Sequence, residues 1–122
     1  MIPRQSAARQ SRRASIRNEL LRRSEALCSR DDQSGLGLAL RGFLPTLERA
    51  FVLDCLPEQG EDIFWVLTGP TEIVKIEVLR NQASNEEHVF PPQMMNIATF
   101  RQTRHSRDVR EKLEIALELI RA

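Results

Sequence analysis

The stretch IFWVLTGPTEIVKIEVL, Ile63 to Leu79, decides the fold of this chain. Its opening residues, Ile63 to Leu67, form a short and fully apolar run that suits a central β-strand. Its closing residues, Glu72 to Leu79, alternate between apolar side chains on one face and charged side chains on the other. The Gly-Pro pair between the two runs is typical of a turn. The stretch therefore predicts two antiparallel strands joined by a short connection.

The segments on either side extend this pair into a meander of three or four strands. A strand is predicted from Ala50 to Leu56, because Phe, Val and Leu are good strand formers, and Pro57 is expected to end it. Asn81 to Gln93 is a polar loop of a length that is often functional, and it contains a candidate fourth strand at His88 to Phe90. Two further segments are not assigned: LGLALRGFL before the sheet is apolar but broken by Gly37 and Gly42, and MMNIATF after it fits either a strand or a helix.

A C-terminal helix is predicted from about Arg107 to the end of the chain, with Ser106 as its N-cap. Its apolar side chains cover a wider arc than packing on a single sheet face requires, because Ile115 and Leu119 extend the usual stripe. The helix is therefore either wedged between two elements or in contact with a partner through Ile115 and Leu119. A homodimer formed by this helix is one version of that contact. Sheet and helix together predict one α+β domain over residues 34–122.

Residues 1–33 are predicted to form a basic arm that is partly helical or disordered. The first 30 residues hold eight arginines against two glutamates, whereas residues 31–80 hold nine acids against four bases. Apolar side chains at helical spacing predict a helix from Ala14 to Ser29, and the first dozen residues have too few of them to fold without a partner. The arm is expected to contact a partner or to fold back on its own domain.

Within the arm, the stretch SRRASIR, Ser11 to Arg17, resembles a twin-arginine export signal. Heavily charged residues follow it where such a signal needs an apolar segment, so this interpretation fails. The Arg-rich, Ser-rich and acid-free first 18 residues also fit an organellar transit peptide. Arg-Arg-Ala-Ser-Ile further resembles the substrate of a basic-directed kinase, with Ser15 as the phosphate acceptor. A cytoplasmic protein is expected, or an organellar one if residues 1–30 act as a transit peptide.

Catalytic chemistry, cofactors, metals and membrane insertion are not expected. Cys28 and Cys55 predict reduced thiols, with Cys55 in the core, and the histidines lack the spacing of a metal site. No apolar run approaches the length that spans a bilayer. An enzyme would need a nucleophile and a base or acid that converge. The candidates are Cys55 with His88 or His105, and the carboxylates of one acidic turn, Glu58, Glu61 and Asp62.

Two functions remain, and binding is central to both. The first is stoichiometric association with another protein, as chaperones, immunity proteins and adaptors do, with electrostatic contacts from Arg12, Arg13, Arg17, Arg22 and Arg23. The alternative is association with nucleic acid, in which the arm and a second basic group neutralise phosphates, that group being Arg101, Arg104 and Arg107. The arm offers no aromatic side chain to stack on a base, and the excess of arginine over lysine also fits genome composition.

Overall fold

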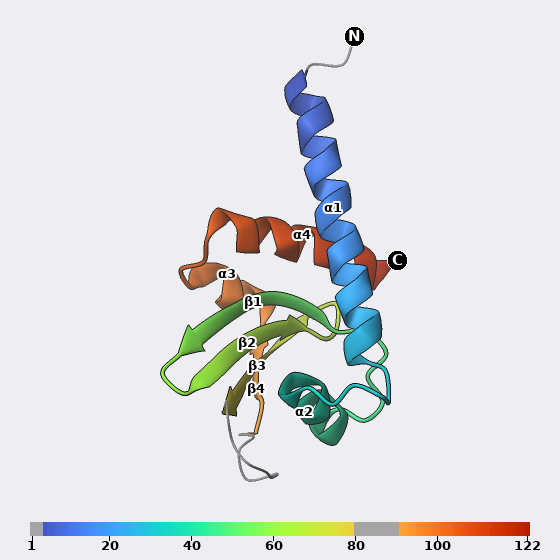
Figure 1. Ribbon diagram of the computed structural model, residues 1–122. Coiled ribbons are helices and arrows are strands. Elements are labelled where there is room, and N and C mark those ends of the chain that lie inside the picture. Colours follow the sequence, from blue (N-terminus) through green and yellow to red (C-terminus); the bar gives the residue numbers. More distant parts are fainter. Residues whose placement is uncertain (1–3, 80–90) are drawn as a thin grey trace.

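The computed structural model describes residues 4–79 and 91–122. Helices and strands form an α+β fold with a C-terminal helix, as the sequence predicts (Figure 1). In chain order the elements are α1 (Arg4–Leu27), α2 (Gly35–Phe43), β1 (Phe51–Glu58), β2 (Glu61–Leu67), β3 (Glu72–Leu79), β4 (Gln93–Asn96), α3 (Ile97–Gln102) and α4 (Arg107–Arg121).

The sheet is an antiparallel meander of four strands in the order β1-β2-β3-β4. Its register places Phe51 opposite Leu67, Leu67 opposite Ile73, and Ile73 opposite Met95. These four apolar side chains therefore lie in one row across the sheet and pack into one core. The fourth strand comes from the segment that fits either a strand or a helix. The candidate strand at His88 to Phe90 lies outside the described residues.

Helices cover both faces of the sheet (Figure 1). On one face, α1, α3 and α4 pack with the sheet through a cluster that includes Leu20, Phe100 and Leu113. On the other face, α2 packs against the sheet through side chains such as Leu36 and Leu40. The alternation of side chains along each strand thus fills two cores.

The structure assigns one uncertain segment and corrects one expectation in this region. The glycine-rich segment of uncertain state forms α2, with Ser34 as the N-cap whose side chain accepts a hydrogen bond from the backbone N–H of Gly37. Pro57 does not end β1, which continues through it to Glu58, with Pro57 opposite Asp62. Proline is tolerated here because β1 is an edge strand, where one side of the backbone needs no ladder hydrogen bond.

The C-terminal helix α4 begins at Arg107, and the side chain of Ser106 accepts a hydrogen bond from Val109 N–H, as the sequence predicts. It contacts α1 as well as β1 and β2. Ile115 is fully buried in the core, and Leu119 packs half-buried against the same cluster. The apolar face is therefore largely wedged inside the molecule, where Ile115 is buried, and a partner contact through Leu119 stays a prediction.

The N-terminal helix α1 begins at Arg4, well before the Ala14 expected from apolar spacing. Its second half belongs to the packed domain, since Leu20 lies in one core cluster and Leu27 in the other. Buried Ser24 joins α1 to the sheet, because its hydroxyl accepts a hydrogen bond of 2.9 Å from the backbone N–H of Ala50. The N-terminal part of α1 extends beyond the rest of the molecule (Figure 1). No helix in the described part of the chain is long and apolar enough to cross a membrane.

Candidate functional site

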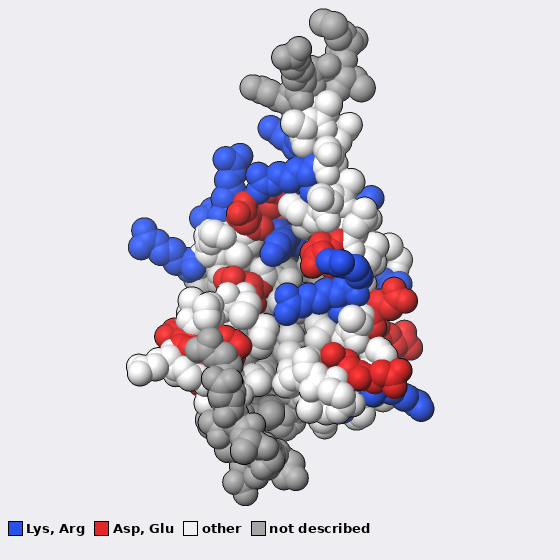
Figure 2. Space-filling model, viewed as in Figure 1, with Lys and Arg blue, Asp and Glu red and all other residues white. Residues whose placement is uncertain are grey.

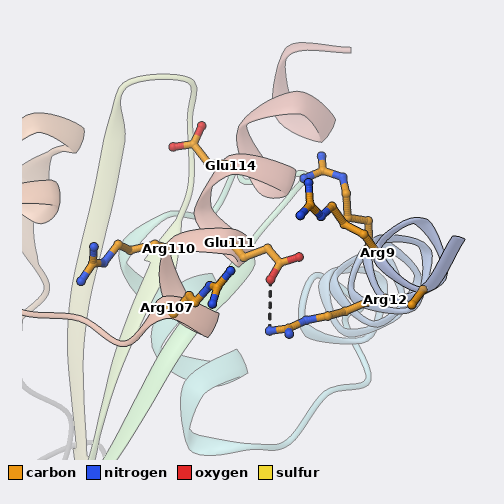
Figure 3. Close-up of a pocket in the computed structure, with 8 residues that line it drawn as sticks. Arg9, Arg12, Arg107, Arg110, Glu111 and Glu114 are labelled. Carbon is orange, nitrogen blue, oxygen red and sulfur yellow. Dashed lines mark ion pairs between the residues drawn. The ribbon is translucent and has the colours of Figure 1, made fainter. Parts of the chain in front are cut away.

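A groove of about 520 Å³ lies between the N-terminal half of α1 and the beginning of α4 (Figure 3). It is lined by Ala8, Arg9, Arg12 and Arg13 from α1 and by Arg107, Arg110, Glu111 and Glu114 from α4. Five arginines against two glutamates make its wall predominantly cationic, which raises the local concentration of anions. We call this feature the cationic groove.

Helical spacing explains why these side chains share one space. Arg12 and Arg13 follow Arg9 by three and four positions on α1, so both lie on the same side of that helix as Arg9. Arg107 and Glu111 stand four positions apart on α4 and face α1 (Figure 3). The arm therefore meets Arg107, one member of the second basic group, at this groove although the two are far apart in the sequence.

Ion pairs across the groove attach α1 to α4. Arg12 pairs with Asp108 and also with Glu111, at 3.1 Å from its carboxylate. A guanidinium nitrogen of Arg13 lies 3.0 and 3.2 Å from the two carboxylate oxygens of Glu118. The guanidinium of Arg17 is 3.7 Å from Glu118. The arm thus folds back on its own domain, the alternative that its charge had left open.

Two arginines of the cationic groove remain available. Over residues 4–79 and 91–122, neither Arg9 nor Arg107 forms an ion pair or a side-chain hydrogen bond. Arg110 points away from α1 and donates to the backbone carbonyl of His105 at 3.2 Å (Figure 3). Glu114 pairs with Arg101 at 2.6 Å, outside the groove. The unengaged cations are therefore one side chain from each of the two helices.

The remaining arginines expected at the site lie elsewhere. Arg22 pairs with Glu19 one turn earlier on α1. Arg23 lines a separate cavity with Lys112 and Val52. Arg104 is exposed in the segment between α3 and α4 and does not line the groove.

A cluster around His105, which the sequence did not reveal, positions the start of α4. The imidazole is only 7% exposed and stacks on Phe100 with ring centroids 3.9 Å apart. Its ring centroid lies 5.9 Å from that of Trp65 in an edge-to-face arrangement, and Thr103 Oγ1 lies 2.6 Å from its Nε2. Its Nδ1 is 3.8 Å from a carboxylate oxygen of Asp54. These contacts fix the segment that precedes Arg107 and so help to set the shape of the groove.

The two cysteines differ in their exposure. Cys55 is exposed rather than in the core, because it lies on the part of the edge strand that the helices do not cover. Cys28 is half-buried, and burial raises the pKa of its thiol, with a hydrogen bond to Ser24 opposing the effect in part. In the described segments, no three His, Cys, Asp or Glu side chains gather as metal ligands. His88 lies outside those segments.

Family models, curated proteins and solved structures were each searched, and none matches the chain.

Proposed function

We propose that the protein is a small, non-enzymatic binding module that associates stoichiometrically with another protein through the cationic groove. One observation carries the proposal: Arg9 and Arg107 open onto the same groove from two helices, with no partner among the described residues. Guanidinium groups bind carboxylates through paired, directional hydrogen bonds, so two of them on a fixed frame favour a defined partner.

The distribution of charge favours a protein partner over a nucleic acid. Basic and acidic side chains are interleaved over α1 and α4 on the face in Figure 2. Interleaved charge complements the mixed charge of a protein surface, whereas the nucleic-acid backbone presents an unbroken row of negative charge.

Nucleic-acid association is the second candidate, and the meeting of Arg12 and Arg13 with Arg107 at one groove supports it. Arg101 and Arg104 lie nearby in the chain, but Arg101 is already paired with Glu114. Binding of this kind is dominated by phosphate contacts and falls steeply as salt is raised.

Capture of partners by the tagged full chain from its native host distinguishes these functions. The resin is washed first at low and then at high salt, nucleic acid is measured by absorbance, and retained proteins are identified by mass spectrometry. A single protein retained near one-to-one supports the proposed function. Nucleic acid that is lost at high salt, with no protein retained, contradicts it and supports the second candidate.

A further inference from the structure

We infer that the cationic groove binds an acidic segment of the partner protein, whose carboxylates bind Arg9 and Arg107. The inference rests on the proposed function and adds the chemistry of the ligand. It also assigns the contact to two residues, of which Arg9 was not among the arginines that the sequence singled out.

The state of each arginine in the groove determines where an incoming carboxylate binds. Arg12 is shared between Asp108 and Glu111, and Arg13 is held by both oxygens of Glu118. A ligand would have to displace these internal carboxylates to reach either guanidinium. Arg9 and Arg107 have no such competitor within the described segments, so they are the first contacts open to a carboxylate.

The residues that line the groove favour a charged ligand. Apart from Ala8, every lining residue carries a charged side chain. No aromatic side chain lines the groove, so a ligand whose affinity comes from stacking on an aromatic ring finds no such ring there. Carboxylates on a peptide need none, because they are recognised by hydrogen bonds from guanidinium groups.

Acidic side chains within the groove distinguish a peptide from a nucleic acid. Glu111 lies between the two helices with its side chain 21% exposed, and Asp108 stands one turn earlier on α4. A continuous run of phosphates along the groove would pass close to these carboxylates, which would weaken its binding relative to a ligand that can avoid them. A peptide can place its acidic residues opposite Arg9 and Arg107 and a neutral or basic residue opposite Glu111.

The beginning of α4 adds to this preference. Arg107 is the first residue of the helix, so a carboxylate bound to it also lies near the positive end of the helix dipole. The dipole contributes to affinity, whereas the two guanidinium groups fix the position of the ligand.

Fluorescence anisotropy with a labelled peptide that alternates Glu and Ser tests the inference on the full chain. The test variant is Arg9→Glu with Arg107→Glu. The control is Arg30→Glu with Arg121→Glu, which changes the net charge equally at two exposed positions that do not line the groove.

Because close charge pairs are both lost and reversed, we expect the groove variant to bind the peptide about tenfold or more weakly than the wild type. The control is expected to stay within about twofold, since distant surface charges are screened. Circular dichroism verifies that all proteins are folded.

Several outcomes would overturn the inference: no binding of the peptide to the wild type, equal weakening by both variants, or tighter binding of a single-stranded oligonucleotide of the same charge.

Repeating the host capture with the groove variant separates this inference from the proposed function. A protein partner that the groove variant retains as well as the wild type would refute the inference and leave the proposed function standing. If the wild type itself retains no protein, the proposed function fails.

Discussion

Burial distinguishes the two thiols of this protein at the scale of single residues. Cys55 is exposed, whereas Cys28 is half-buried, and burial raises the pKa of the Cys28 thiol. The thiolate is the nucleophile in alkylation. Because its pKa is raised, a smaller fraction of Cys28 is in the thiolate form at a pH near or below the pKa of a free thiol. We therefore expect iodoacetamide at about pH 8 to alkylate Cys55 several-fold faster than Cys28, measured by mass spectrometry of timed digests. Equal rates would show that Cys28 is as open as Cys55.

Two glycines of α2, Gly35 and Gly42, differ in the space around them. A Cβ on Gly35 would overlap Cγ1 of Val78, whereas one on Gly42 would meet nothing within 4 Å. Gly35→Ala is therefore expected to destabilise the protein by about 1–3 kcal/mol through overpacking between α2 and β3. Gly42→Ala is expected to stabilise it by about 0.5–1 kcal/mol, because alanine is the better helix former. Urea unfolding followed by circular dichroism measures both. A gain in stability from Gly35→Ala would show that α2 is not held closely against β3.

At the scale of elements, α1 consists of two halves held by different interactions. Its second half contributes the buried residues Leu20 and Leu27 to the two cores. Its first half is attached through Arg12 and Arg13, whose ion pairs with α4 are largely exposed. Exposed pairs of this kind contribute little, whereas the burial of a leucine contributes several-fold more.

Removal of residues 1–15 is therefore expected to lower the free energy of unfolding by no more than about 1–2 kcal/mol. Leu20→Ala, which keeps the whole helix, is expected to cost about 2–4 kcal/mol. Urea unfolding, with the fluorescence of Trp65 as a probe, compares the two. If the truncation costs more than Leu20→Ala, the ion pairs of the first half contribute more to stability than exposed pairs normally do.

Elements with an unambiguous periodic pattern could be predicted from the sequence, and those that depend on distant packing could not. β2, β3 and α4 lie close to their predicted positions, because apolar runs, alternation and the cap at Ser106 are local signals. α2 was not assigned, because its glycines lower helix propensity, and the close approach of Gly35 to Val78 is visible only in the fold. β4 was ambiguous, since a four-residue strand gains its stability from pairing with β3.

At the scale of the whole molecule, charge that is segregated in the sequence becomes interleaved in space. The arginine-rich arm lies against α4, where Asp108, Glu111 and Glu118 accept its ion pairs. The basic groups that form the candidate site could be named from the sequence, but their meeting could not, because it depends on how α1 and α4 cross. For the same reason, Arg9 was missed, and Arg22 and Arg23 were included although they lie outside the groove.

Ile115 and Leu119 of α4 are expected to respond differently to the introduction of a charge. Ile115 is fully buried between the sheet and the other helices, whereas Leu119 is only half-buried. A carboxylate placed at Ile115 would lose its hydration without gaining a partner, at a cost of several kcal/mol, which is comparable to the total stability of about 5–15 kcal/mol typical of a small domain. We expect Ile115→Glu to abolish the cooperative urea transition seen by circular dichroism. Leu119→Glu is expected to remain folded with a loss of about 1–2 kcal/mol, because its carboxylate can reach water. A folded Ile115→Glu protein with a wild-type transition would place Ile115 on the surface and restore α4 as a contact for a partner or for a second copy of the chain.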